Sequence, residues 1–460
     1  MVQGTHEQST GESGWGEICA PIAIFFASIS VHIAPFFFFG AHPLGYDTGF
    51  YRRYLIEPFV SFPNPAVPGL GDDALLPRMF FDFLRFLHIP TDGILYGSYI
   101  LLFALLPVLI YFFIKPTLGM RGALLAAVFV IFSPVQYAAY WYFLWKNAWA
   151  ILLLFGAFIG IERNFFLGVV VLDIAIAFSH KTSAVVYIAT LIMLAIISRE
   201  KRRSALTHIV IAGAALLAIN LAGVNHALRA VPSAVFLEWQ EYMWLSLAFF
   251  GALAVGWKGL EKHVPHPLIA FAIASFAFPI FHLPIYERVF VFTDVALALF
   301  AAFAVEWMLA TAPRASHLAR GAYFLGFALL TGTFFGTLVQ EARALPPLID
   351  AISIQDIQNI GRLVPKDATL LTTANEAPWY EGWTTAHIAA PGMLRDNHNL
   401  EVWTAFWGAT STKAQKRFLD DFPKPLYIST LGDFTELIGI PPKCFKPVSP
   451  WLLLDTCQTH

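Results

Sequence analysis

Long apolar runs separated by short polar connections fill the first three quarters of the chain. A membrane-spanning helix needs about 20 predominantly apolar residues. Runs close to that length predict about eleven transmembrane helices, at 18–40, 94–114, 122–141, 147–161, 165–179, 182–198, 205–222, 242–257, 266–285, 289–310 and 321–340. Residues 1–17 are polar, and no small-residue cleavage site follows them, so we expect a cytoplasmic N-terminal tail before a first transmembrane helix.

The composition excludes a water-soluble protein. Of the 460 residues, 57% are hydrophobic and only 13% are charged, whereas soluble domains carry about 25% charged residues. A soluble chain of this size could not cover its surface with so few charges. We therefore expect an all-α polytopic membrane domain over 18–340 and a separate extracytoplasmic domain in the more polar segment 341–460.

Basic residues gather in alternate connections, and this predicts the orientation of the chain. Cytoplasmic connections of membrane proteins carry the excess of Lys and Arg. With the N-terminus in the cytoplasm, the short outer connections hold only Lys146, Lys181, Arg229 and Arg288. The inner connections then hold eleven basic residues, which are Lys115, Arg121, Arg163, Arg199, Lys201, Arg202, Arg203, Lys258, Lys262, Arg314 and Arg320. This asymmetry places the long loop 41–93 and the segment 341–460 together on the outer side.

The long first outer loop is not simply polar. Its segments 50–60 and 75–88 alternate charged and apolar faces at helical spacing, which is typical of amphipathic helices lying in the membrane interface. A Pro- and Gly-rich stretch separates them and predicts a turn region.

The segment 341–460 predicts a small α/β domain. Its expected helices are 352–363 and 411–421, and its expected strands are 368–373, 387–390, 425–430 and 451–455. Cys444 and Cys457 lie close together there, and they either form a disulfide or remain two buried thiols.

The segment Gly45-Tyr46-Asp47-Thr48-Gly49-Phe50-Tyr51 directly follows the first apolar run. A carboxylate at the edge of the hydrocarbon can accept a proton from a substrate, or hold a metal ion against it. Asp47 equally suits the cap of an amphipathic helix that begins at Thr48. The sequence leaves both roles open.

Three more segments repeat this combination of polar residues at an outer helix end or in the tail. They are Phe178-Ser179-His180-Lys181-Thr182-Ser183, Tyr286-Glu287-Arg288-Val289-Phe290 and Glu376-Ala377-Pro378-Trp379-Tyr380-Glu381-Gly382-Trp383. Together with the Asp47 segment, the large first outer loop and the C-terminal outer domain, they make the chain resemble the GT-C superfamily of integral membrane glycosyltransferases, in its bacterial form.

The resemblance implies a transfer reaction at the outer face of a bacterial inner membrane. A sugar would pass from a polyprenyl phosphate or diphosphate donor to a lipid, glycan or protein acceptor, with Asp47 as the general base or acceptor-positioning group. The substrate contacts implied for the matching positions and their neighbours are Tyr46, Tyr51, Arg52, Arg53, His180, Lys181 and Arg288. Cations suit a departing phosphate. The same arginines equally suit anchoring in the interface, His180 equally suits simple contact with water, and Arg288 equally suits a local ion pair with Glu287.

A second acidic group is expected near the first. Asp72 and Asp73 in the same loop are the candidates, and they equally suit a helix cap near Ala74. Many GT-C members have an adjacent acidic pair at the first site, whereas Thr48 follows Asp47 here. A divalent cation is therefore left open, no organic cofactor is expected, and we find no nucleic-acid signature.

Two other functions fit parts of the pattern. A secondary transporter or flippase often has two similar halves and broken helices, and no internal repeat is visible in the sequence. A polysaccharide polymerase or ligase usually has its large loop late in the chain, whereas here it comes first.

Asp173 interrupts one apolar run. Because a carboxylate in the bilayer costs about 3 kcal/mol, it should face a partner or a cavity.

Overall fold

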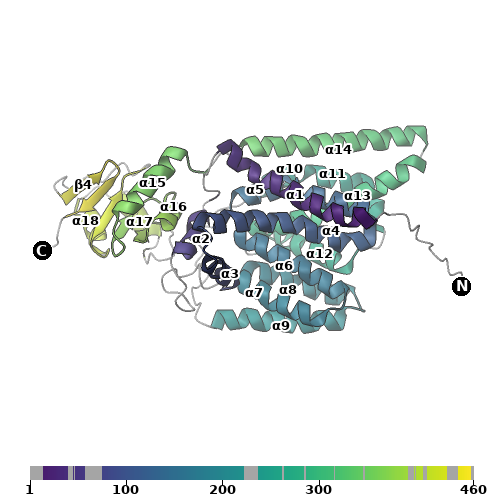
Figure 1. The fold of residues 1–460 in the computed structure, drawn as a ribbon, viewed down its shortest axis with the longest axis horizontal. Coiled ribbons are helices and arrows are strands. Elements are labelled where there is room, and N and C mark those ends of the chain that lie inside the picture. The colour runs from purple at the N-terminus through teal and green to yellow at the C-terminus, as the bar shows by residue number, and fades with distance from the viewer. Residues whose placement is uncertain are drawn as a thin grey trace.

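The computed structural model describes residues 14–39, 45, 47–56, 75–221, 237–261, 264–283, 286–314, 316–344, 348–391, 398, 400–407, 412–431 and 444–456. A bundle of long helices forms the larger part, and a small domain with a sheet lies at one end of it (Figure 1). We call this end, which carries the C-terminal domain, the tail end, and the opposite end of the bundle the far end.

The helices follow the apolar runs of the sequence. In chain order they are α1 (Gly14–Phe39), α2 (Asp47–Ile56), α3 (Leu75–Phe86), α4 (Thr91–Ile131), α5 (Pro134–Trp141), α6 (Trp145–Glu162), α7 (Phe166–Ser179), α8 (Lys181–Ile197), α9 (Arg202–Leu221), α10 (Trp239–Leu245), α11 (Leu247–Gly256), η1 (Trp257–Glu261), α12 (His266–Ile280), α13 (Tyr286–Thr311), η2 (Ala312–Arg314) and α14 (His317–Ala344).

Several of these helices have the length and apolar character of membrane spans. Within the described ranges six qualify, or seven if the bent pair α10 and α11 is one span. The prediction of a multi-pass membrane protein is therefore supported. The predicted count of about eleven is not confirmed, because α7, α8 and α12 have only 14, 17 and 15 residues.

The two predicted spans 94–114 and 122–141 lie in α4 and α5, and the chain reverses between them. Gly119 has non-helical angles, φ 69° and ψ −174°, which glycine adopts without steric cost. The Tyr99 hydroxyl donates to the carbonyls of Ala139 and Tyr140, both at 3.1 Å. Because Tyr99 lies about as far before Gly119 as Tyr140 lies after it, the two halves pack against each other as a helical hairpin.

The basic connections separate to the two ends of the bundle. Lys115 pairs with Glu17 at the start of α1 at 2.8 Å, and Arg121 pairs with Glu306 late in α13 at 2.7 Å. These pairs fix the Gly119 turn at the far end. Lys201 also belongs there, because its Nζ donates to the carbonyl of Ile161 at the end of α6. The described residues predicted to lie on the inner side thus share one end.

Asp173 has hydrogen-bond partners, as we expected for a carboxylate within an apolar run. Its carboxylate is fully buried, and it accepts hydrogen bonds from the Tyr187 hydroxyl and from the His208 ring, each at 2.7 Å. The three residues belong to α7, α8 and α9, so this polar contact joins three neighbouring helices.

The C-terminal domain is a five-stranded mixed sheet between two layers of helices. The strands are β1 (Thr369–Leu371), β2 (His387–Ala389), β3 (Leu426–Ser429), β4 (Phe445–Ser449) and β5 (Leu452–Asp455), in the order β2-β1-β3-β5-β4. β1 is parallel to β2 and β3, whereas β5 is antiparallel to β3 and β4. The helices are α15 (Ala351–Leu363), α16 (Ala377–Trp383), α17 (Leu400–Trp407) and α18 (Thr412–Asp420).

Alternation along the strands produces two cores, one on each face of the sheet. Leu370 packs with α15 and α16, and the next residue, Leu371, packs with α17 and α18. The predicted α/β domain is confirmed, with both expected helices and all four expected strands present. β4, α16 and α17 were not predicted.

Cys444 is disulfide-bonded and Cys19 is a free thiol, while Cys457 lies outside the described residues.

The two interfacial helices predicted in the first outer loop exist as α2 and α3, but α2 does not lie on a lipid surface. Its residues Tyr51, Arg53, Tyr54 and Leu55 are all buried, because α2 is enclosed between the bundle and α16. α3 keeps the expected exposed apolar face, with Phe83 and Phe86 more than half exposed.

Candidate functional site

A tight contact between two turns sets the position of Asp47. Gly45 has φ +59°, and a Cβ there would overlap the carbonyl of Tyr142 and lie 2.8 Å from the nitrogen of Phe143. Phe143 itself has φ 58°, which is rare for a bulky residue, and its buried ring packs 4.2 Å from the Tyr99 ring. This turn leads directly into α6, whose first residues include Lys146. The segment before α2 is thereby held beside the start of α6.

Four ionisable groups from four separate segments meet at the tail end, and we call them the Asp47 cluster. They are Asp47 of α2, Lys146 of α6, His180 between α7 and α8, and Arg288 of α13. Lys146 and Arg288 act electrostatically on the Asp47 carboxylate, and the same two cations act on the His180 ring. The structure thus brings together Asp47, His180 and Arg288, which the sequence had placed on one side of the membrane.

Burial and the two cations set the protonation states of the cluster. Burial raises the pKa of the Asp47 carboxyl, and the charges of Lys146 and Arg288 oppose that rise. Burial lowers the pKa of His180 well below its usual value, and both cations lower it further. His180 is therefore a neutral imidazole near pH 7. Its Nδ1 lies 2.7 Å from the Ser183 hydroxyl, which fixes the ring.

The Asp47 side chain does not cap a helix. It is the first residue of α2 and is half-buried, and within the described residues its carboxylate has no hydrogen bond and no ion pair shorter than 4 Å. Arg288 is exposed at the start of α13, and the part of α13 that the structure describes has no ion pair between Arg288 and Glu287. The cluster therefore combines a carboxylate and a cation that both remain accessible.

The C-terminal domain is held against α2 by a glycine-to-glycine contact. A Cβ on Gly49 would overlap the carbonyl oxygen of Pro378 in α16, and a Cβ on Gly382 would lie 2.7 Å from the Gly49 Cα. Only glycine at both positions permits this approach of the two helix backbones. We call this contact the Gly49–Gly382 seam.

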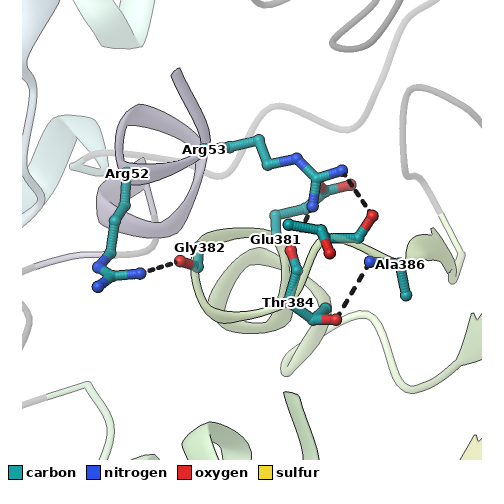
Figure 2. Close-up of polar contacts among 7 residues, drawn as sticks. Arg52, Arg53, Glu381, Gly382, Thr384 and Ala386 are labelled. Atoms are coloured by element: carbon teal, nitrogen blue, oxygen red, sulfur yellow. Dashed lines mark hydrogen bonds and ion pairs between the residues drawn. The ribbon is translucent and has the colours of Figure 1, made fainter. Parts of the chain in front are cut away.

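Two arginines flank the seam and bind the backbone of α16 and the residues that follow it (Figure 2). Arg52 Nη1 donates to the Gly382 carbonyl at 2.5 Å, and its guanidinium lies 4.8 Å from the centre of the Trp383 ring. Arg53 donates to the carbonyls of Thr384 and Thr385 and lies 3.9 Å from the carboxylate of Glu381. Arg52 also pairs with Asp92 at 3.0 Å.

This geometry gives several predicted substrate contacts another role. Arg53 and Tyr51 are only 2% exposed, and the Tyr51 ring packs 5.9 Å from that of Trp145. Arg52 and Arg53 join the two parts of the protein, so they are not placed to meet a donor phosphate as the sequence had suggested. Lys181 begins α8 and is not among the electrostatic partners of Asp47.

The remaining predicted site residues, Tyr46, Asp72 and Asp73, lie outside the described residues. Among the residues that are described, no three His, Cys, Asp or Glu side chains form a group that could hold a metal ion. A metal ion held with the help of Asp72 and Asp73 therefore stays a prediction.

Lys146 is the member of the cluster that sequence reasoning missed. The sequence predicts it only as a basic residue in an outer connection. Its signal is a lysine directly after an aromatic turn, Tyr142-Phe143-Leu144-Trp145, at the start of an apolar run. A lysine at a helix start that is only 8% exposed is unusual, because lysine side chains are seldom buried. This burial indicates a role beside the carboxylate.

The sequence matches no known protein-family model, and no curated protein is significantly similar to it.

Replacing Gly49 by alanine should loosen the C-terminal domain. The added methyl group must displace the Pro378 carbonyl, and overpacking of this kind costs about 1–3 kcal/mol. We expect a lower apparent melting temperature of the purified protein and faster proteolysis of the domain. Gly97→Ala is the matched control, because a Cβ at Gly97 in α4 meets open space. Equal behaviour of the two variants would contradict the seam.

Replacing Lys146 by methionine should raise the pKa of the Asp47 carboxyl further. Lys146 is the larger of the two charges that lower this pKa, so its loss favours the protonated carboxyl. Infrared titration of the carboxyl C=O band, with Asp47→Asn as the blank, measures the change. Lys181→Met should leave the titration unchanged, and a shift of the same size in that control would show that the effect is not local.

Proposed function

We propose that the chain transfers a sugar from a polyprenyl-phosphate or polyprenyl-diphosphate donor to an acceptor at its tail end, with Asp47 as the base. One observation carries the proposal: an accessible carboxylate with a raised pKa lies among two cations and a neutral histidine, at the end of a membrane bundle that also carries a folded polar domain. A lipid-linked donor needs both a membrane surface and charges for its phosphate.

The proposed reaction uses each member of the cluster. The acceptor hydroxyl attacks the anomeric carbon of the sugar while the Asp47 carboxylate takes the hydroxyl proton. A new glycosidic bond forms, and the bond between the anomeric carbon and the phosphate oxygen breaks. The negative charge stays on the polyprenyl phosphate. Arg288 and Lys146 stabilise that charge, and the neutral imidazole of His180 is able to donate a hydrogen bond to a phosphate oxygen.

The raised pKa of Asp47 suits a general base. A base is most effective when its pKa approaches the working pH, because it must be ionised and still hold a proton well. The two cations oppose the rise in pKa that burial causes, and so they favour the ionised carboxylate. The proposal places this face outside the cytoplasm, and the disulfide at Cys444 supports that side because disulfides form in oxidising compartments.

A secondary transporter or flippase is the second candidate, and one feature favours it. α10 and the helical segment Leu247–Glu261 meet at 59°, as in the broken helices of transporters. Nearby, the fully buried Asp294 accepts hydrogen bonds from Ser133 at 2.7 Å and from Gln136 at 2.9 Å. A buried carboxylate in a span often marks a substrate or ion path.

The Asp47→Asn variant separates these functions. With membranes supplied with radiolabelled polyprenyl-phosphate hexoses and pentoses, we expect transfer to fall by about 100- to 10,000-fold, because the amide cannot take the proton. Asp367→Asn, an exposed carboxylate in the turn before β1, is the control. Undiminished transfer in a folded Asp47→Asn protein would sink the proposal. Uptake of a solute into sealed vesicles that needs Asp294 and tolerates Asp47→Asn would favour the transporter.

A further inference from the structure

One groove of about 380 Å³ lies between α8 and α9, and a second of about 490 Å³ adjoins it along the first turns of α9 and the residues just before them. Arg202 and Leu206 line both grooves, so the two form one continuous furrow. Apolar side chains line one part of it and basic side chains line the other. This arrangement has the two-part chemistry of a phospholipid, which combines an acyl chain and a charged headgroup.

The apolar part faces outward from the bundle. Ile192 and Ile196 of α8 are 42% and 61% exposed, and Leu206 and Val210 of α9 are 51% and 69% exposed. Large apolar side chains gathered in one exposed patch are typical of a surface that meets a partner or a membrane. The first groove lies between these two helices, so an acyl chain can lie along it.

The basic part consists of three exposed arginines with different degrees of freedom. Arg202 Nε donates to the Ala195 carbonyl at 2.9 Å, which fixes its guanidinium at the mouth of the furrow. Arg199 and Arg203 line the same groove and, within the described residues, have no ion pair and no hydrogen bond of their side chains. Three guanidinium groups around one opening can bind a phosphate with several charge-assisted hydrogen bonds.

The furrow lies at the far end, away from the Asp47 cluster. α8 begins beside His180 at the tail end, so its last turn and the first turn of α9 lie at the opposite end of the bundle (Figure 1). The arginines therefore lie at the level of lipid headgroups, and the apolar residues lie at the level of the acyl chains below them. A phospholipid in that leaflet can occupy both parts at once.

We infer that this furrow binds an anionic phospholipid, with the phosphate held by Arg199, Arg202 and Arg203 and one acyl chain along Ile192, Ile196 and Leu206. The inference is independent of the proposed sugar transfer, because the furrow and the Asp47 cluster lie at opposite ends of the bundle.

Native mass spectrometry of the full-length protein tests the site, with phosphatidylglycerol and phosphatidylcholine as probes. The wild type should retain phosphatidylglycerol more tightly. In an Arg199→Gln/Arg203→Gln double variant, that affinity should fall about 25-fold, at about fivefold for each lost charge near a membrane surface. Binding of phosphatidylcholine should change little. Equal affinity of the wild type for the two lipids would overturn the inference.

Two controls separate a specific site from general surface charge. The Lys258→Gln/Arg320→Gln variant removes the same formal charge from the same end without touching the furrow, and it should retain phosphatidylglycerol as the wild type does. A loss equal to that of the double arginine variant would overturn the inference. Leu206→Ser should weaken phosphatidylglycerol but not inorganic phosphate, and competition by inorganic phosphate at the lipid's own concentration would show a simple anion site instead.

Discussion

The arrangement of the tail end depends on the close approach of two helix backbones at the Gly49–Gly382 seam. No side chain fits between α2 and α16, so the carbonyls of Gly382, Thr384 and Thr385 come within reach of Arg52 and Arg53. Each arginine then replaces water as the partner of backbone groups that burial would otherwise leave unsatisfied. The α/β domain is thereby bound to the same helix that carries Asp47 at its first residue.

The cluster joins opposing electrostatic requirements in one place. Enclosure by protein disfavours the charge on Asp47, and two cations favour it, so the carboxyl remains basic while still able to ionise. The same cations and the same enclosure keep His180 uncharged. A neutral imidazole and a basic carboxylate therefore share the same two cations, and the cluster avoids gathering three positive charges around a single negative one.

The sequence predicted what depends on local patterns and missed what depends on long-range contacts. Apolar runs located the helices, and basic residues sorted them to two ends, which also placed Asp47, His180 and Arg288 on one side. The partners of Arg52 and Arg53 are mainly backbone carbonyls more than 300 positions away, and carbonyls leave no trace in a residue pattern. β4 was missed because its residues are largely exposed and include Pro447, so no alternation marks it. Gly119 gave no signal that it turns one continuous helical segment back on itself.

The distance in sequence between the two sides of the seam has a consequence for biogenesis. The bond from Arg52 to the Gly382 carbonyl spans 330 positions. α2 is made early and must wait for nearly the whole chain to be synthesised and inserted before α16 exists to receive it. The seam is therefore completed last, after α16 has been synthesised and the terminal domain has folded. A nascent or truncated chain that lacks α16 therefore leaves Arg52 and Arg53 without the backbone carbonyls that they bind in the complete protein.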